Sequence, residues 1–367
     1  MFANCYKDKK VLVTGNTGFK GTWLTQWLLN LGADVHGLAD RIPTQPSLFE
    51  VLGLESKIKH HFADIRDKET IQKIVKEVSP DFVFHLAAQA IVSESYADPL
   101  TTITTNVVGT ATLLEALRHI DHNCTAVIIT SDKCYENVEQ AEGYMESDRL
   151  GGKDIYSASK GAAELIIHAY HYSFFKARPA VRIAAVRAGN VIGGGDWAVN
   201  RIVPDCFRAW ASGKPVEIRN PQSTRPWQHV LEPISGYLRM GQLLSADERL
   251  HGEAYNFGPH AKQDETVLKV LETLSKWCTP DGLSEKFIYD KTQRTFHEAG
   301  LLKLNCEKAD KDLQWHSTLD FEDTIRLTAT WYQQYYYGDS TSMSDLTNKQ
   351  IGEYITIAKQ KNLPWTK

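Results

Sequence analysis

The chain has 367 residues, of which 42% are hydrophobic, and its 41 basic and 45 acidic side chains leave a formal net charge of −4. This length and composition suit a soluble α/β protein with one large domain and a smaller companion. Because the charges are balanced and form no long run of one sign, nucleic-acid binding, which needs clustered Lys and Arg, is not expected. No stretch approaches the ~20 apolar residues of a membrane span, and the first ten residues lack the apolar core of a secretory signal.

The cysteines also narrow the class of protein. Six of them stand at positions 5, 124, 134, 206, 278 and 306, without C-x-x-C spacing. The chain has neither an H-E-x-x-H motif nor a dense Cys/His cluster, so no metal site is predicted. Reduced thiols in a cytoplasmic protein are the simplest expectation.

Short apolar segments alternate with longer amphipathic ones through the first half of the chain. This alternation is typical of a parallel sheet wrapped by helices, so we predict an α/β fold with a Rossmann-type doubly wound sheet. The predicted strands cover residues 11–14, 34–38, 81–86, 126–129 and 182–187, and the predicted helices cover residues 20–31, 101–119 and 156–175.

After Gly189 the chain becomes rich in glycine and proline, which suits a loop-rich substrate-binding lobe. A further strand is expected within residues 251–258. We therefore predict a larger domain at residues 1–189 that contains the parallel sheet, to which segments of about 230–260 return, and a smaller C-terminal substrate-binding lobe at residues 190–338. Residues 339–367 form a tail that begins with polar residues and is expected to be poorly ordered.

A glycine-rich turn, Gly15-x-x-Gly18-x-x-Gly21, joins the first predicted strand to the first predicted helix. Glycine lets backbone N–H groups approach a pyrophosphate, and the start of a helix favours its negative charge. We predict that this turn, with Thr17 and Phe19, binds a dinucleotide. The spacing departs from the G-x-G-x-x-G pattern, and the alternative is a strand–turn–helix corner without a ligand.

Two acidic positions are candidates for the adenosine end of that cofactor. Asp40 lies about twenty residues beyond the glycines, where a carboxylate binds ribose hydroxyls. Arg41 would suit a 2′-phosphate, so NAD is favoured over NADP, and a solvated Asp40 is the alternative. Asp64, with Ile65 beside it, follows a predicted third strand and could bind the adenine amine, whereas Asp67 is equally well explained as a helix N-cap.

The segment His85-Leu86-Ala87-Ala88-Gln89 ends another predicted strand. Its small side chains would let the cofactor pass close to the backbone, so Leu86, Ala87 and Ala88 are predicted cofactor contacts. Gln89 is assigned to the substrate. His85 is interpreted as a core histidine with its hydrogen bonds satisfied.

Tyr156 and Lys160 lie four residues apart on a predicted helix and therefore share one face. An ammonium one turn from a phenol stabilises the phenolate, and the positive nicotinamide ring adds to this effect. Tyr156 is then able to accept a proton from a hydroxyl whose carbon loses hydride.

Ser131, Asp132 and Lys133 follow a predicted strand, at the end where open α/β sheets place their chemistry. Ser131 can hydrogen-bond the hydroxyl that Tyr156 deprotonates. Asp132 and Lys133 are two further acid/base groups, which a simple alcohol oxidation does not require. A surface salt bridge between them is the alternative.

Taken together, these motifs resemble the extended branch of the short-chain dehydrogenase/reductase family, which modifies nucleotide sugars. The similarity runs from about residue 8 to about residue 335 and is greatest for the 4,6-dehydratases of that branch. Ser-Asp-Lys in place of the Thr-Asp-Glu of the dTDP-glucose enzymes, together with residues 225–230, favours CDP-glucose as the substrate. The segments that carry the resemblance are residues 13–24, 46–49, 130–135, 151–160, 189–197 and 225–230.

The resemblance implies a reaction. NAD⁺ takes hydride from C4 of the sugar, a base removes the C5 proton, water leaves from C6, and hydride returns to C6. By position, Asp132 is the acid and Lys133 the base. Since a free lysine titrates near ~10.4, a protonated Lys133 that stabilises the enolate is the alternative.

Recognition of the nucleotide is expected in the second lobe. Guanidinium groups bind phosphate oxygens in a planar fork, which favours arginines for the diphosphate. Trp227 or His229 could border the base, although packing explains Trp227 equally well. The predicted substrate contacts are Asn190, Arg201, Arg219 and Arg225.

Other functions stay open at this point. An epimerase or decarboxylase of the same branch would not need Asp132 and Lys133, and a 4,6-dehydratase of another nucleotide sugar is harder to exclude. A non-catalytic NAD-sensing protein is disfavoured because Tyr156 and Lys160 are both present. The resemblance also implies a homodimer or homotetramer formed through helices 101–119 and 156–175, and a role in deoxysugar synthesis for surface polysaccharides such as the lipopolysaccharide O-antigen.

Overall fold

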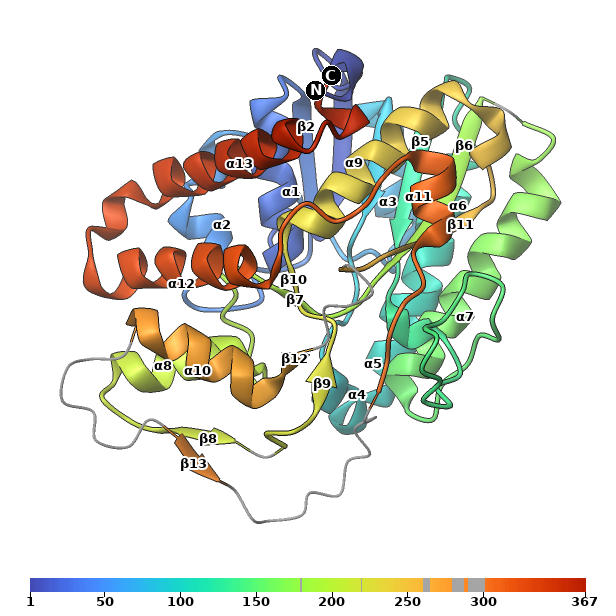
Figure 1. Cartoon of the computed structure of the whole chain (residues 1–367). Coiled ribbons are helices and arrows are strands. Elements are labelled where there is room, and N and C mark those ends of the chain that lie inside the picture. The colour runs from blue at the N-terminus through green and yellow to red at the C-terminus, as the bar shows by residue number, and fades with distance from the viewer. Residues whose placement is uncertain (179, 219, 260–264, 279–286, 290–300) are drawn as a thin grey trace.

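A parallel sheet of seven strands forms the centre of the molecule (Figure 1). The structure is a computed structural model that describes residues 1–178, 180–218, 220–259, 265–278, 287–289 and 301–367. The strands follow the order β11-β6-β5-β4-β1-β2-β3. They are β1 (Lys10–Thr14), β2 (Asp34–Ala39), β3 (Lys59–Phe62), β4 (Phe82–His85), β5 (Cys124–Ile129), β6 (Val181–Ala188) and β11 (Ala254–Phe257).

The predicted doubly wound fold is confirmed by this strand order, which reverses direction between β1 and β4. Every pair in the sheet is parallel. In such sheets ligands bind outside the carboxyl ends of the strands, at the point of reversal. The turns after β1, β4 and β5 are therefore the places to look for a site.

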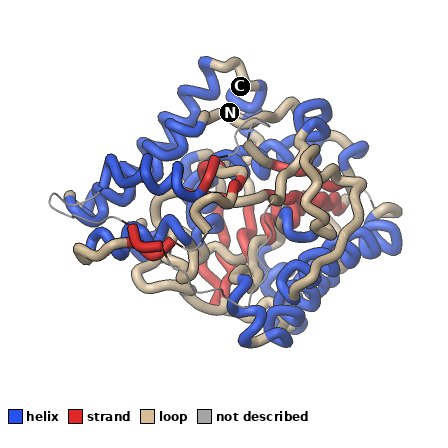
Figure 2. Tube along the Cα trace, turned by 60° about the horizontal axis from the view of Figure 1, so that its bottom comes forward, coloured by secondary structure: helices blue, strands red, loops and turns tan. Residues whose placement is uncertain are grey.

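Helices cover both faces of the sheet, and Figure 2 shows the strands enclosed between them. Alternate residues of each strand point to opposite faces. Val11 and Val13 of β1 thus pack with α1 and α9, while Leu12 packs with α3, α6 and α7. The bounds are α1 (Phe19–Asn30), α3 (Lys68–Val78), α6 (Gly109–Leu117), α7 (Ile155–Tyr170) and α9 (Leu231–Ala246).

Two of the predicted helices are not single regular α-helices, because each region includes a π-helical segment. The helix predicted at residues 101–119 consists of α5 (Pro99–Ile103), the π-helical segment η3 (Thr104–Val108) and α6. After α7 the chain likewise continues as the π-helical segment η5 (His171–Phe175). Such bulges lie outside the 3.6-residue period that the sequence pattern reports.

The residues after β6 form small elements beside the main sheet, and in Figure 1 α8, α10, β8 and β13 lie together. β8 pairs with β13, β7 with β10, and β9 with β12. These elements are β7 (Val191–Ile192), α8 (Ile202–Ala211), β8 (Val216–Ile218), β9 (Thr224–Arg225), β10 (Gln228–His229), β12 (Glu265–Thr266), α10 (Val267–Cys278), β13 (Phe287–Tyr289), α11 (Glu307–Leu313) and α12 (Phe321–Tyr337). The short elements elsewhere are η1 (Phe2–Asn4), α2 (Leu48–Val51), η2 (Leu54–Ser56), α4 (Val92–Ala97), η4 (Asp132–Cys134), η6 (Glu248–Leu250), η7 (Ser340–Ser342) and η8 (Pro364–Thr366).

The prediction that the segment beyond Gly338 is poorly ordered is wrong. It forms the helix α13 (Met343–Gln360), whose apolar face is buried in the core. Trp365 is also buried and stacks on Phe2, with 5.2 Å between the ring centroids. The two chain ends therefore lie side by side (Figure 1), because the aromatic side chains of each end need the other for burial.

Candidate active site

The glycine-rich turn packs backbone against backbone. Gly15 has a φ of +72°, and a Cβ placed there would lie 2.7 Å from the backbone nitrogen of Ala87. A Cβ at Gly21 would lie 2.1 Å from the carbonyl oxygen of Gly15. Gly18 is the N-cap of α1 and provides no side-chain hydrogen bond. The first N–H groups of α1 are thus available for an anion, and the turn fits a pyrophosphate.

The predicted adenosine contacts lie at the ends of β2 and β3. The hydroxyl of Thr17 donates to the carbonyl of Arg41 at 2.7 Å, which ties the glycine turn to the segment that carries the exposed Asp40. Asp64 forms an ion pair with Arg66 at 2.6 Å, and this partner lowers the pKa of Asp64. The ribose and adenine roles stay predictions.

Two neighbouring positions have clear structural roles. The carboxylate of Asp67 accepts the Thr70 N–H at 3.2 Å, so the interpretation of Asp67 as the N-cap of α3 is confirmed. Ile65, a predicted cofactor contact, is buried, and a Cβ at Gly109 would lie 2.7 Å from its Cγ2. Ile65 therefore packs against α6, and its contact with a cofactor stays a prediction.

His85 is a core histidine, as predicted. Its Nδ1 lies 2.7 Å from the Thr14 hydroxyl and its Nε2 lies 3.1 Å from the Thr110 hydroxyl. Burial lowers its pKa to about 3, so the ring is neutral. The residues that follow, Leu86 and Ala87, approach the glycine turn closely.

Gln89 has partners within its own loop. Its Oε1 accepts the N–H of Ile91, and its Nε2 donates to the Thr102 hydroxyl at 2.8 Å. The backbone of Gln89 is held by Asn106, whose Nδ2 also donates to Ser159 of α7 at 2.8 Å. Gln89 thus positions the chain beyond Ala88, and its contact with a substrate stays a prediction.

The structure brings all five predicted catalytic side chains into one cluster after β5. Ser131 caps the short helix η4, and its hydroxyl donates to Asp132 at 2.9 Å. Asp132, Tyr156 and Lys160 are buried, and the Lys160 ammonium lies 6.0 Å from the centroid of the Tyr156 ring. Lys133 is half-buried beside them.

Burial dominates the electrostatics of this cluster. It raises the pKa of Tyr156 to about 12, against a hydrogen bond with Ser131 that lowers it. It lowers the pKa of Lys160 to about 8. Burial also raises the pKa of Asp132, although the charge of Lys133 acts in the opposite direction. A carboxyl group whose pKa is raised holds its proton to higher pH than a free carboxyl group, which suits an acid catalyst.

Lys20 is a cation of the cluster that sequence reasoning missed. Burial and the charges of Arg201 and Lys160 together lower its pKa to about 8, against the charge of Asp132, which raises it. Lys20 stands between two glycines of the dinucleotide turn. A charged residue at that position is a signal that the sequence already contains.

The four substrate residues predicted in the second lobe differ in their surroundings. Arg201 begins α8, pairs with Asp196 at 3.0 Å, and lowers the pKa of Tyr156 through its charge, so it belongs to the catalytic cluster. Asn190 lies directly after Gly189, where a Cβ would be 3.1 Å from Asp132 Oδ2. Arg225 is buried in β9 and donates to the Thr224 carbonyl at 2.7 Å, and Arg219 lies outside the described residues.

Trp227 and His229 are both buried in the structure. The indole of Trp227 donates to the carbonyl of Glu265 at 3.0 Å, as its packing interpretation requires. His229 is fully buried, with its ring edge-on to Trp23. A contact of Trp227 or His229 with the nucleotide base stays a prediction.

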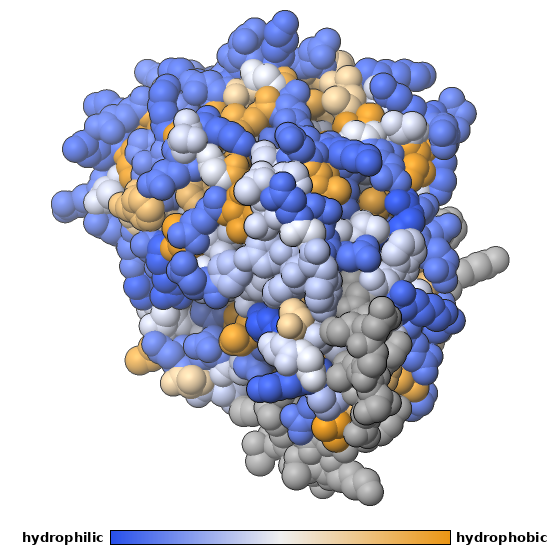
Figure 3. Space-filling model, turned by 90° about the vertical axis from the view of Figure 1, so that its left-hand side faces the viewer, coloured by the Kyte–Doolittle hydropathy of each residue, from blue (hydrophilic) through white to orange (hydrophobic). Residues whose placement is uncertain are grey.

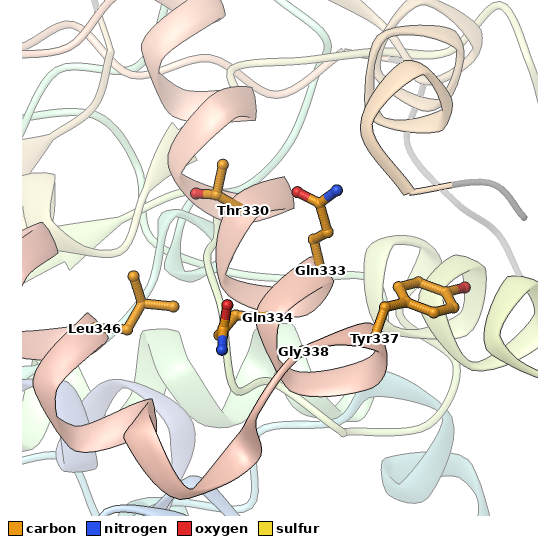
Figure 4. Close-up of a pocket in the computed structure, with 6 residues that line it drawn as sticks. All are labelled: Thr330, Gln333, Gln334, Tyr337, Gly338 and Leu346. Atoms are coloured by element: carbon orange, nitrogen blue, oxygen red, sulfur yellow. The ribbon is translucent and has the colours of Figure 1, made fainter.

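A separate surface hollow lies between α12 and α13, far along the chain from the catalytic segments (Figure 4). It is lined by Thr330, Gln333, Gln334, Tyr337, Gly338 and Leu346 and contains no predicted site residue. The part of the chain that the structure describes holds no group of three or more His, Cys, Asp or Glu side chains arranged for a metal ion.

Comparisons with known proteins agree with this geometry. The family model described as GDP-mannose 4,6 dehydratase matches residues 12–328. The chain belongs to this family. Among its relatives, the CDP-glucose 4,6-dehydratase of Salmonella typhimurium (strain LT2) is 42% identical over 96% of this chain and 98% of that protein. The dTDP-glucose 4,6-dehydratase of Haemophilus influenzae (strain Rd) is 26% identical over 88% of this chain and 97% of that protein.

Solved structures share the fold of this GDP-mannose 4,6 dehydratase family member. The epimerase Mth375 of Methanothermobacter thermautotrophicus has a TM-score of 0.78 at 22% identity, covering 95% of this chain and 96% of that one. The UDP-glucuronic acid 4-epimerase of Bacillus cereus, in complex with UDP-glucuronic acid and NAD, has a TM-score of 0.74 at 25% identity and covers 89% and 99%. The family model and the 42% identical relative confirm the predicted extended short-chain dehydrogenase/reductase family.

Proposed function

We propose that the chain is a hydro-lyase that converts CDP-D-glucose to CDP-4-dehydro-6-deoxy-D-glucose with bound NAD. The observation that carries this proposal is the position of Asp132 beside the Tyr156–Lys160 pair, in a chain 42% identical to a CDP-glucose 4,6-dehydratase over nearly its whole length. A carboxyl group of raised pKa at this place supplies the acid that elimination needs and that oxidation alone does not.

The residues after β1 and β4 fit the dinucleotide. The turn from Gly15 to Gly21, against which Leu86 and Ala87 pack, leaves the N-terminus of α1 open to the pyrophosphate. Thr17, Phe19 and Ala88 are proposed as further cofactor contacts. Asp40, Asp64 and Ile65 are proposed at the adenosine end. When bound, NAD⁺ accepts the hydride from C4 of the sugar and returns it to C6.

The side chains of the cluster move the protons. Tyr156 Oη takes the proton from the C4 hydroxyl, while Ser131 hydrogen-bonds the same oxygen and Lys160 stabilises the phenolate. Once C4 is a ketone, the C5 proton is acidic, and Lys133 removes it. Asp132 donates its proton to the C6 hydroxyl oxygen, which leaves as water. When hydride adds to C6, Lys133 returns a proton to C5, which completes the product. The substrate is held by Asn190, Arg201, Arg219, Arg225 and Gln89 in this proposal.

The first test is incubation with CDP-, dTDP-, GDP- and UDP-glucose in the presence of NAD⁺, followed by mass spectrometry of the products. CDP-glucose is expected to lose the mass of one water without net formation of NADH. Water loss from another nucleotide sugar would retain the mechanism and change the substrate. An unchanged mass with altered stereochemistry at C4 would identify an epimerase and contradict the role of Asp132.

We also propose that the enzyme is a cytoplasmic homo-oligomer. Large apolar side chains are exposed on the neighbouring helices α5 to α7, among them Leu100, Ile103 and Val108, with Leu165 59% exposed. By contrast, apolar residues are scattered among hydrophilic ones on the face seen in Figure 3. The change Leu165→Glu is expected to yield monomers in analytical ultracentrifugation, and an unchanged assembly would contradict this interface.

Two further observations bear on location. Five cysteines, Cys5, Cys124, Cys134, Cys206 and Cys306, are free thiols, which suits a reducing compartment. None of the described helices is long and apolar enough to cross a membrane.

A further inference from the structure

A buried ion pair lies directly behind the catalytic cluster. Glu164 stands on α7, one turn after Lys160, and Arg187 stands on β6; both side chains are only 4% exposed. Arg187 Nε donates to Glu164 Oε1 and Arg187 Nη2 donates to Oε2, each at 2.9 Å. This two-bond fork is the geometry in which a guanidinium holds a carboxylate most firmly.

The pair holds both ends of the segment that carries Ser131, Asp132 and Lys133. At one end, the hydroxyl of Thr130 donates to Glu164 Oε1. At the other end, Arg187 Nη1 donates to the hydroxyl of Tyr135 at 2.7 Å.

The contacts continue from Tyr135 into the rest of the fold. The Tyr135 hydroxyl donates to Asn256 Oδ1 on β11 at 2.8 Å. Arg187 Nη1 also donates to the carbonyl of Glu146, whose carboxylate accepts the N–H of Asn256 at 2.8 Å. The turn Ser131–Lys133 is therefore connected to α7, β6 and β11 through one ion pair.

Stability alone does not require this arrangement. Removing two charges from water costs free energy, and apolar side chains of similar volume often serve a core as well or better. The pair does, however, set the distance between two elements that must act together: the turn after β5, with its acid and base, and the helix α7, with Tyr156 and Lys160.

We propose that Glu164 and Arg187 are positioning residues, which hold the Ser131–Lys133 turn and the Tyr156–Lys160 face of α7 in register for the reaction. The inference deepens the proposed dehydratase function and rests on it. Thr130 transmits the effect because its hydroxyl joins the last residue before the turn to the Glu164 carboxylate.

Glu164 also acts on Lys160 through its charge. Burial lowers the pKa of Lys160, and the Glu164 carboxylate raises it again. Loss of that negative charge would therefore deprotonate Lys160 at lower pH and remove the ammonium that Tyr156 needs. The titratable groups that face Lys160 are Glu164, Cys134, Lys20 and His85, and those that face Tyr156 are Asp132, Asp154 and Arg201.

The first experiment changes only the hydroxyl of Thr130. Thr130→Val keeps the shape and loses the donor, whereas Thr130→Ser keeps the donor. We expect Thr130→Val to lower kcat about 10- to 100-fold with little change in KM, because a small displacement of an acid or base slows the chemical step. Thr130→Ser is expected to restore most of the rate. Thr328→Val, at a buried threonine of α12, controls for the loss of a hydroxyl in general.

The second experiment tests the charge. Glu164→Gln is expected to shift the alkaline limb of the kcat profile of the NAD-loaded enzyme to lower pH by about one unit, from one charge at a separation of one helical turn. The same shift should be seen in the titration of Lys160 by NMR with ¹³C-labelled lysine, assigned with Lys160→Arg. Equal rates in Thr130→Val and wild type, equal losses in the valine and serine variants, or an unmoved Lys160 titration would overturn the proposal.

Failure of the proposed function would look different. In that case the wild-type chain would dehydrate none of the nucleotide sugars, while the NMR titration would still report whether Glu164 controls Lys160. If Glu164→Gln does not fold, the Thr130 pair still decides the positioning role.

Discussion

Replacement of Gly15 by alanine tests how the cofactor turn is built. Gly15 has a φ of +72°, and its added Cβ would lie 2.7 Å from the nitrogen of Ala87 and 2.8 Å from the carbonyl carbon of Leu86. Such contacts are shorter than a Cβ tolerates, and the obstructing atoms are backbone. The turn after β1 and the segment after β4 must therefore move apart.

The expected loss of stability in Gly15→Ala has two main contributions. A left-handed φ costs an L-residue about 1–2 kcal/mol, and overpacking of a well-packed site costs about 1–3 kcal/mol. Alanine also restricts the unfolded chain, which returns about 0.4–1 kcal/mol. We therefore expect Gly15→Ala to lower the free energy of unfolding by about 2–4 kcal/mol.

Gly53 provides the matched control, since it has a φ of +60° but nothing within 4 Å of an added Cβ. Gly53→Ala should show only the backbone part, about 1 kcal/mol. Urea unfolding of the two variants and wild type measures the backbone contribution and the overpacking contribution separately. Calorimetric titration with NAD⁺ should show weaker binding for Gly15→Ala and unchanged binding for Gly53→Ala. Equal stabilities and equal affinities of the two variants would refute the reasoning.

Three further predictions concern single side chains. Lys133→Met should abolish exchange of the C5 proton with solvent, measured by mass spectrometry in deuterated water, and exchange at the wild-type rate would exclude Lys133 as the base. Burial raises the pKa of Glu232 to about 7, above its unfolded value of about 4.3. The protonated Glu232 therefore contributes its full share of stability at low pH, and this share is lost as the pH rises to about 7. Glu232→Gln should remove that pH dependence, and parallel stability–pH curves for variant and wild type in urea would contradict it. Trp365→Ala should lower the free energy of unfolding by about 3–5 kcal/mol, because it leaves a cavity between Phe2 and Tyr354. A urea unfolding midpoint close to that of wild type would show that the C-terminal residues are dispensable for stability.

Some features of the site were predictable because they depend on short stretches of chain. The Tyr156–Lys160 spacing, the glycines of the first turn and the capping role of Asp67 follow from the local geometry of helices and turns. The core role of His85 was also recognised, since it ends an apolar strand. The resemblance of these motifs to one enzyme family then indicated their chemistry.

Other residues could not be placed because their roles depend on partners distant in sequence. Glu164 meets Arg187 across two elements, and Trp365 meets Phe2 across the whole chain. The complete burial of His229 depends on packing with Trp23 of α1. A periodic pattern reports which face of an element is apolar, and it does not report which surface will cover that face.

The sequence by itself determined the parallel sheet, the cofactor turn and the types of acid and base, because strand and helix periods and motif spacings are local properties. Only the tertiary structure decided that the C-terminal segment folds into the core, that Lys20 and Arg201 join the catalytic cluster, and that one buried ion pair fastens the catalytic turn to α7. Those outcomes arise where side chains from separate elements share one desolvated volume. In that volume the charge of each side chain changes the pKa and the hydrogen-bond strength of its neighbours.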